Sequence, residues 1–232
     1  PKNLKIKKDV VNRITKEDLQ YDLDTSLKTM DIDCVDVFLL HRDDESKTVD
    51  DIIPILDNFV KQGKTRFVGV SNWKPERIEK ANEFIVKENM SPLVLSQCYF
   101  SLAESTPEKF DDSTIVCINK AEYEWYEKSK MPLMAYTSQA KGFFTKIHNG
   151  NMKKSDIVRF MSDDNIERAR KAKKLADEYS VSPTCIALAY LTNNKVQTSA
   201  IIGPRNLSQL EDSMKVKDVM LSKDQIKWLN GE

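Results

Sequence analysis

Polar and aromatic side chains stand directly after short apolar runs at five separate places: His41, Ser71 with Asn72, Gln97, Tyr136 and Arg205. Hydroxyl, amide and imidazole groups form hydrogen bonds in several directions, and a guanidinium fork binds two oxygens of a phosphate. Taken singly, each residue has a structural explanation, such as a bond to a neighbouring loop for His41 or a helix cap for Ser71. Five such endings together are better explained by a shared ligand site.

The apolar runs that precede these residues are expected to be parallel strands. They span about 35–40, 65–70, 93–96, 132–135 and 198–202, with amphipathic helices between them. Strands that are apolar throughout must be covered on both faces, which is typical of parallel sheets with helical crossovers. Because the carboxyl ends of such strands lie on one side of the fold, the five endings should meet there.

The helices are expected at about 16–30, 49–62, 75–89, 119–129, 164–179, 183–193, 207–215 and 223–230. Thr15 can cap the first helix, whose inward face is expected to carry Leu19, Leu23, Leu27 and Met30. The segments 97–118 and 136–163 are expected to be long loops on the side of the strand ends. Trp73 and the 97–118 loop are expected either to line a pocket there or to mediate subunit contacts.

The stretch from Gly203 to Gln209 has the features of an anion site. Arg205 precedes a helix whose first turn is expected to hold a capping box between Asn206 and Gln209. Exposed N–H groups at a helix start attract anions. An ordinary capped helix with a surface arginine is the alternative. The SQAKG segment, residues 138–142, would suit a loop lying close to phosphate.

The composition excludes several classes of function. Formal net charge is zero, so no overall field would attract nucleic acid or an acidic membrane surface. No apolar run approaches the roughly 20 residues that span a bilayer, and no signal peptide is visible. The four cysteines are widely separated, which is typical of buried thiols in a reducing compartment. We expect a cytoplasmic protein with a single domain over residues 1–232 and no metal site.

The sequence resembles the aldo-keto reductases over essentially all of residues 16–217, and it is most similar to bacterial members with a YSSQAKGFF-like stretch. The resemblance is carried by LLHRDD at 39–44, GKTRFVGVSNW at 63–73, SQCYFSLAE at 96–104, PLMAYTSQAKGFF at 132–144 and IIGPRNLSQLEDS at 201–213. It implies an α/β fold of the TIM (β/α)8 barrel type and reduction of aldehydes and ketones to alcohols with NADPH.

The resemblance also implies roles for single residues. His41 matches the histidine that helps to form the pocket polarising the substrate carbonyl. Ser71, Asn72 and Gln97 match residues that bind the nicotinamide carboxamide, and Tyr136 matches the aromatic residue that stacks on the nicotinamide. The loop along the pyrophosphate is matched by Thr137, Ser138, Gln139, Lys141 and Gly142. The stretch that holds the 2′-phosphate and adenosine is matched by Gly203, Arg205, Gln209 and Asp212, and an arginine there favours NADP over NAD.

Two departures from the family pattern stand out. Asp212 and Ser213 stand where the family often has Glu-Asn, which weakens the inference for adenine contacts. The family's proton-donating tyrosine, with the lysine and aspartate that tune it, lies upstream of the histidine. The 40 residues before His41 contain no strand that ends in tyrosine or aspartate. Five strands are counted where a closed barrel needs eight, so the sequence is expected to be a fragment, the C-terminal portion of a barrel.

Three interpretations follow from this pattern. The first is a reductase represented by part of its chain, with a small carbonyl compound as its partner. The second is a non-catalytic module that binds a nicotinamide cofactor, like the channel-associated β subunits that share this fold. The third is a reading frame without a stable fold. An open five-stranded sheet would expose two apolar edges, so a homo-oligomer or a rearranged edge is expected for this chain alone.

Overall fold

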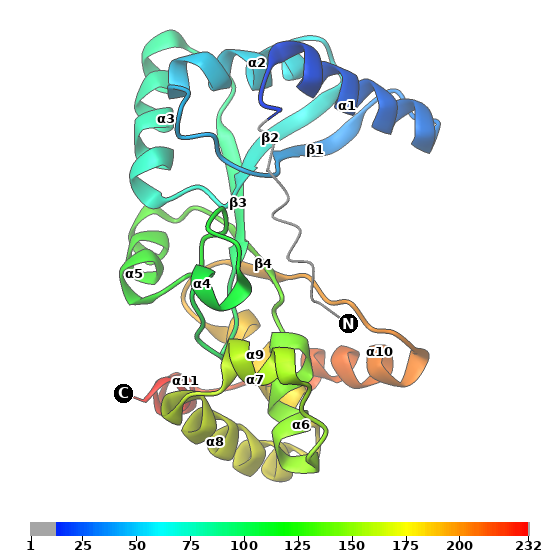
Figure 1. Cartoon of the computed structure of the whole chain (residues 1–232), viewed down its shortest axis with the longest axis vertical. Helices are drawn as coiled ribbons and strands as arrows, with labels where there is room; N and C mark the ends of the chain where they lie inside the picture. The colour runs from blue at the N-terminus through cyan, green and yellow to red at the C-terminus, as the bar shows by residue number, and fades with distance from the viewer. Residues whose placement is uncertain (1–12, 232) are drawn as a thin grey trace, which may run out of the picture. The chain divides into compact units, whose positions relative to one another are not determined.

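The computed structural model describes residues 13–231. The chain forms two compact units (Figure 1). The first contains the described residues up to Phe38, together with Asp44–Val68 and Lys80–Pro92. The second contains Leu39–Asp43, Gly69–Glu79 and the chain from Leu93 onward. The single domain expected from the sequence stays a prediction, and each unit is described by itself.

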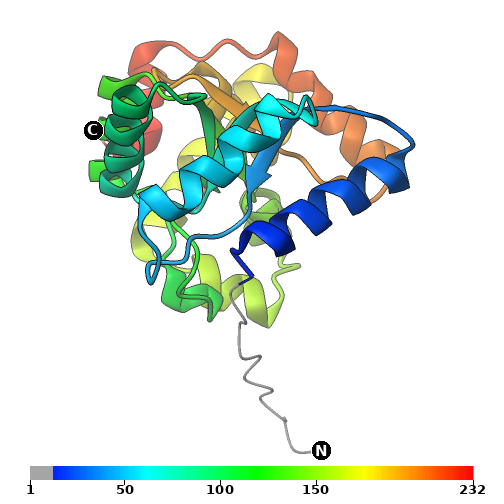
Figure 2. The same cartoon turned by 90° about the horizontal axis from the view of Figure 1, so that it is seen from above.

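The first unit is built from α1 (Lys16–Met30), α2 (Val49–Lys61), most of α3 (Pro75–Glu88) and the first parts of β1 (Val35–Leu40) and β2 (Thr65–Ser71). As expected, Thr15 caps α1 by accepting the amide of Asp18. α1 and α2 lie side by side (Figure 2). Leu19, Leu23 and Leu27 of α1 are buried. Met30 is 51% exposed, contrary to expectation, because it lies in the last turn, next to the left-handed cap residue Asp31.

The second unit is built on β3 (Leu93–Tyr99), β4 (Leu133–Tyr136) and β5 (Thr198–Ala200). These strands are parallel, with Cys98 opposite Ala135 and Leu133 opposite Thr198. The helical elements are α4 (Pro107–Phe110), α5 (Lys120–Ser129), η1 (Ala140–Gly142), α6 (Phe143–Asn149), α7 (Lys154–Phe160), α8 (Asp163–Tyr179), α9 (Pro183–Asn193), α10 (Leu207–Met214), η2 (Lys215–Asp218) and α11 (Lys223–Asn230). α6, α8 and α9 pack together (Figure 1). None of the helices within residues 13–231 is long and apolar enough to cross a membrane.

The order of the strands in space decides between the two folds that such alternation permits. The five strands form one sheet in the order β1-β2-β3-β4-β5, the same as their order along the chain. A doubly wound sheet reverses its order at a switch point, whereas a (β/α) barrel adds strands in sequence. The barrel-type fold is therefore confirmed, and the strands within the described residues leave it unclosed, with β1 and β5 at the edges.

Two expectations about element lengths were wrong. β3 continues to Tyr99, so Gln97 lies within a strand and not after it. The regions 97–118 and 136–163, both expected to be loops, contain helices: α4 lies in the first, and η1, α6 and α7 lie in the second. These helices have seven residues or fewer, which is about two turns and too short for a recognisable helical period. Gly142 and Gly150, both with positive φ, bracket α6 and supply the turns at its ends.

Candidate functional site

Asn72 connects the ends of several strands. It follows β2 with φ at 60° and is 4% exposed. Its side-chain nitrogen donates to the carbonyl of His41 (3.3 Å) and to Ser71 Oγ (2.9 Å). Its side-chain oxygen accepts from the amide of Val116 (3.1 Å) and from the hydroxyl of Tyr136 (2.8 Å). A carboxamide has two donor hydrogens and two acceptor lone pairs, so the protein itself uses the full capacity of this side chain.

Ser71 and Gln97 differ in what they leave for a ligand. Ser71 is buried, donates its hydroxyl to the carbonyl of Gln97 (2.8 Å) and accepts from Asn72. Within residues 13–231, the side-chain nitrogen of half-buried Gln97 meets only the sulfur of Met134, at 3.2 Å. A thioether is a weak acceptor. Among the three residues expected to bind a carboxamide, Gln97 therefore has the side chain most open to a ligand.

Tyr136 ends β4 beside a second tyrosine. Its ring lies 6.3 Å from that of Tyr99, centroid to centroid, with the planes 71° apart. Burial raises the pKa of the Tyr136 hydroxyl, which donates to Asn72. Burial also raises the pKa values of Tyr99 and Tyr126. None of these hydroxyls therefore has the lowered pKa that a tuned proton donor requires.

His41 follows β1 and is exposed. Its Nε2 lies 3.3 Å from Arg42 Nη1, and Arg42 Nη2 lies 3.4 Å from Asp112 Oδ2. Partial desolvation lowers the pKa of the imidazole and the charge of Arg42 lowers it further, whereas Asp112 opposes both effects. His41, Ser71, Asn72, Gln97 and Tyr136 thus form one cluster towards the carboxyl ends of β1 to β4. Arg205, which was expected to share this site, lines a separate cleft.

The chain after Tyr136 makes an unusual turn. Thr137, Ala140 and Lys141 have φ at 53°, 44° and 54°, followed by Gly142 at 80°. Left-handed conformations cost energy for residues with a Cβ, and they persist where surrounding contacts hold them. Here Ser138 Oγ donates to the carbonyl of Ile201, and Gln139 donates to Ser213 Oγ at 2.9 Å. The turn is therefore held against the segment after β5 and against α10.

A cleft of about 990 Å³ opens beside this turn. Its walls are the 137–142 turn, α6 and α7, the segment 201–205 and α10. Nine of the residues predicted to bind a cofactor line it, namely Thr137, Ser138, Gln139, Lys141, Gly142, Gly203, Arg205, Gln209 and Asp212. The structure thus divides the predicted site into two groups, the cluster around Asn72 and this cleft, which are joined through Tyr136 and Thr137.

The cleft is positively charged. Six cationic side chains line it, Lys141, Lys146, Lys153, Arg159, Arg205 and Lys215, against three carboxylates, Asp156, Glu211 and Asp212. Burial and the neighbouring charge of Arg159 lower the pKa of Lys141. Burial by itself would raise the pKa of Asp156, but Lys146, 2.8 Å away, lowers it overall. Such a surface would favour an anionic ligand.

The start of α10 departs from the expected capping box. Asn206 accepts the amide of Gln209 at 3.0 Å, as expected. The Gln209 side chain, however, accepts the amide of Arg205 (2.9 Å), one residue before the cap. Asp212 accepts from Ser182 Oγ at 2.6 Å. Gln209 and Asp212 are therefore engaged with the protein, whereas the exposed guanidinium of Arg205 has no partner in residues 13–231.

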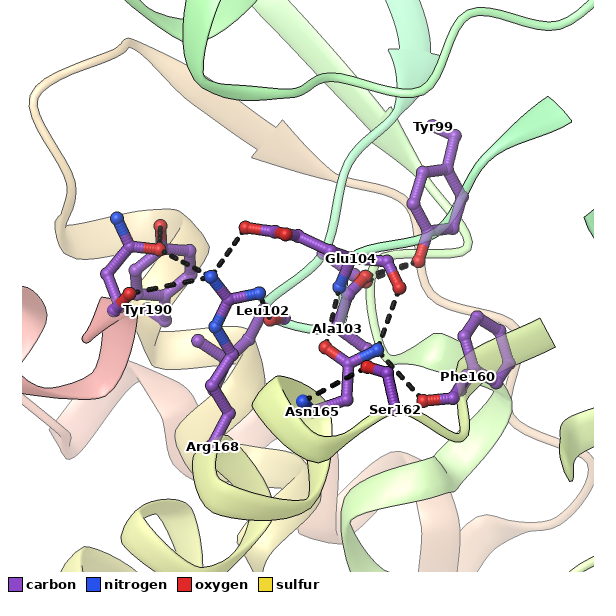
Figure 3. A network of polar contacts seen from close by, with 11 residues as sticks. Tyr99, Leu102, Ala103, Glu104, Phe160, Ser162, Asn165, Arg168 and Tyr190 are labelled. Atoms are coloured by element: carbon purple, nitrogen blue, oxygen red, sulfur yellow. Dashed lines mark hydrogen bonds and ion pairs between the residues drawn. The ribbon is translucent and has the colours of Figure 1, made fainter.

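The contacts that hold the segment after β3 were not predicted from the sequence (Figure 3). Fully buried Asn165 accepts the amide of Glu104 (2.9 Å) and donates to the carbonyls of Glu104 and Phe160, both at 2.8 Å. Arg168, 7% exposed, pairs with Glu104 and donates to the carbonyls of Leu102 and Asn230. Because Leu102, Glu104 and Asn230 lie over 60 residues in sequence from the side chains that bind them, no local pattern could reveal these contacts.

Trp73 and the cysteines have structural positions. Trp73, expected to line a pocket, is fully buried, with the Arg77 guanidinium 5.0 Å from its ring centroid. All four cysteines are free thiols, and Cys98, Cys117 and Cys185 are buried. Burial raises the pKa of Cys98, and it raises those of Cys117 and Cys185 to about 12 and about 11. Burial therefore disfavours the reactive thiolate form of these three residues.

The chain belongs to the aldo/keto reductase family. The sequence profile of the Aldo/keto reductase family matches residues 3–231, nearly the whole chain. This match confirms the family resemblance that was based on the five strand-end segments.

Two relatives show how far the similarity extends. The chain is 26% identical over 204 residues to L-glyceraldehyde 3-phosphate reductase of Escherichia coli K12, covering 83% of this chain and 56% of that protein. It is 25% identical over 215 residues to aldo-keto reductase yakc [NADP(+)] of Schizosaccharomyces pombe, covering 88% and 59%. The chain therefore spans less than two thirds of the length of these relatives.

A solved structure supports the fold. A crystal structure of a thermostable aldo-keto reductase with the inhibitor epalrestat matches with a TM-score of 0.69 at 22% identity. The match covers 94% of this chain and 67% of that one.

Proposed function

We propose that this chain forms the cofactor-binding part of an NADP(H)-dependent oxidoreductase that reduces aldehydes or ketones to alcohols. The observation that carries the proposal is the positively charged cleft beside the 137–142 turn. It brings together residues from two segments more than 60 positions apart, both predicted from sequence to bind phosphate groups. The name of the fission yeast relative, which includes NADP(+), supports the choice of cofactor.

The residues present fit such a cofactor. A cleft of about 990 Å³ lies at the upper end of the range for ligand sites. The position of a Cβ on Gly203 is open, so backbone approach to a ligand is unobstructed there. Lys141 and Arg205 are exposed cations on opposite segments of the wall. A phosphate at the adenosine end would accept two parallel hydrogen bonds from the free guanidinium of Arg205.

The cluster around Asn72 would bind the nicotinamide end of the cofactor and the carbonyl group of the substrate. A bound NADPH would supply a hydride to the carbonyl carbon. Gln97 has a side chain able to hold the carboxamide, and the half-buried ring of Tyr136 offers an apolar face beside it. His41 would orient the substrate oxygen. Because burial raises the pKa of Tyr99, Tyr126 and Tyr136, we assign the proton donor to none of them.

Calorimetric titration with NADPH and NADH tests the proposal. We expect the chain to bind NADPH. Arg205→Ala should weaken NADPH binding by about 10- to 100-fold, because the lost hydrogen bonds to a charged phosphate correspond to that change in affinity. NADH binding should be nearly unaffected by this substitution, because NADH lacks the 2′-phosphate. Arg170→Ala, at an exposed ion pair of α8, is the matched control and should change neither affinity. Equal affinities of the wild-type chain for both cofactors would refute NADP specificity.

The reaction itself is tested in the whole protein. NADPH consumption with short aldehydes should be lost or strongly reduced in His41→Ala. If NADPH binds tightly but no carbonyl compound is turned over, the non-catalytic binding module becomes the better explanation.

A further inference from the structure

The surroundings of His41 restrict which of its ring nitrogens carries the proton. Arg42 Nη1 lies 3.3 Å from His41 Nε2 and 3.1 Å from the carbonyl oxygen of His41. A guanidinium group has five N–H donors and no acceptor. An Nε2 that contacts it must therefore accept the hydrogen bond and carry no proton itself. Nδ1 has no hydrogen-bond partner within residues 13–231.

We propose that Arg42 is a positioning residue that holds His41 as the neutral imidazole with its proton on Nδ1. In this state Nδ1–H is the only ring donor that His41 can offer to a carbonyl oxygen. The assignment of that donor to a substrate rests on the proposed function, but the tautomer itself does not.

A second pair of contacts fixes Arg42 in place. Asp112 Oδ2 lies 3.4 Å from Arg42 Nη2. The other oxygen of Asp112 accepts from the Thr114 amide (3.0 Å) and hydroxyl (2.6 Å). Thr114 thus orients Asp112, Asp112 orients Arg42, and Arg42 orients His41. The segment between β3 and α5 therefore contributes to the site, because it supplies the Asp112 carboxylate that orients the Arg42 guanidinium.

The charges around the ring favour the same state. Burial lowers the pKa of His41, and Arg42 lowers it further, because a nearby cation disfavours a second positive charge. Asp112 acts in the opposite direction and is the other charged group that affects the ring. Removing Arg42 should therefore raise the pKa of His41, whereas removing the charge of Asp112 should lower it.

The second histidine provides an internal reference. His148 Nε2 lies 3.0 Å from the carbonyl oxygen of Ala169. A carbonyl accepts and cannot donate, so this nitrogen must carry a proton. The two histidines of the chain are thus expected to be opposite tautomers.

Nitrogen NMR of the uniformly labelled chain tests the proposal directly. Two-bond correlations from the ring protons distinguish a protonated ring nitrogen from an unprotonated one, and His148→Gln assigns the two rings. At alkaline pH, we expect His41 to be the Nδ1–H form and His148 to be the Nε2–H form. An Nε2–H form of His41 in the wild-type chain would overturn the proposal.

Variants separate the effect of Arg42 from general loss of structure. Arg42→Met should increase the Nε2–H population of His41 and raise its pKa, while the signals of His148 remain unchanged. Arg170→Met removes an exposed arginine from α8 and should alter neither ring. If Arg42→Met folds poorly, Thr114→Val releases Asp112 and should shift the tautomer of His41 in the same direction. An unchanged His41 tautomer in both variants would refute the role of Arg42.

The same variants distinguish this inference from the proposed function. A failure of NADPH to bind would refute the cofactor proposal and leave the tautomer result standing. If the whole protein reduces carbonyl compounds, Arg42→Met should move the acidic limb of its pH profile upward, together with the NMR pKa of His41. A profile that stays fixed while the NMR pKa moves would show that His41 does not orient the substrate.

Discussion

The hydroxyl of Tyr136 donates a hydrogen bond of 2.8 Å to the side-chain oxygen of Asn72, a residue 64 positions earlier in the sequence. This bond joins the end of β4 to the turn after β2. Asn72 is in turn bonded to the carbonyl of His41 and the amide of Val116. His41, Val116 and Tyr136 are thus held by one fully bonded carboxamide, so its loss should affect all of them together.

Tyr136→Phe should destabilise the chain by about 1 kcal/mol, because one hydrogen bond to Asn72 is lost while a second acceptor bond remains. Asn72→Ala should cost at least about 3 kcal/mol, since it leaves several buried groups without partners. Urea denaturation measures both values. In the double variant the two losses should not add, because both remove the same bond. Strict additivity would contradict a direct bond.

Arg168→Met should cost about 2 kcal/mol, because charged hydrogen bonds to two backbone carbonyls and to Glu104 disappear. Hydrogen exchange at the amides of residues 103–105 should accelerate at the same time. Arg170→Met is the control on the same helix, and its ion pair with Glu167 is exposed on both sides. That change should cost under about 0.5 kcal/mol. Equal losses for the two variants would contradict the buried role of Arg168.

Asp156→Asn should destabilise the chain by about 2 kcal/mol near neutral pH, because the buried carboxylate loses its charged bond to Lys146. The pKa of Asp156 is lowered on folding from an ordinary value of 3.8. Its contribution to stability is therefore complete above that value and is lost as the pH falls through the lower folded pKa.

Urea denaturation of wild type and Asp156→Asn across a pH series measures this difference. The difference in the free energy of unfolding between the two proteins should be constant above about pH 5 and should decrease to zero at more acidic pH. A difference that increases on acidification would show that burial, and not Lys146, dominates the pKa of Asp156.

Gly69→Ala should distort the middle of β2. An added Cβ would lie 2.6 Å from the carbonyl oxygen of Leu95 and 2.7 Å from Leu39 Cδ2. The leucine side chain can move but the backbone oxygen cannot, so we expect a loss of about 1–3 kcal/mol. Gly63→Ala is the comparison, where the added atom meets open space but φ is 69°. Gly63→Ala should lower the free energy of unfolding by about 1 kcal/mol. In NMR spectra, Gly63→Ala should leave the signals of His41 unchanged, whereas Gly69→Ala should perturb them.

The sequence by itself determined the alternation of strands and helices, several caps and the grouping of the strand ends. These features follow from local rules, since helix periodicity and caps such as Thr15 act within a few residues. The meeting of strand ends follows from the parallel arrangement. His41, Ser71, Gln97 and Tyr136 could therefore be placed at one site without coordinates.

Only the tertiary structure decided which groups remain available to a ligand. Asn72, expected to bind a carboxamide, is fully bonded to groups up to 64 residues away, and Gln209 and Asp212 are engaged with the protein. The proton position on His41 likewise depends on Arg42, whose orientation is set by Asp112, 70 residues further along the chain. Residue type and spacing show what a side chain can bind, but its partners are fixed by packing between distant segments.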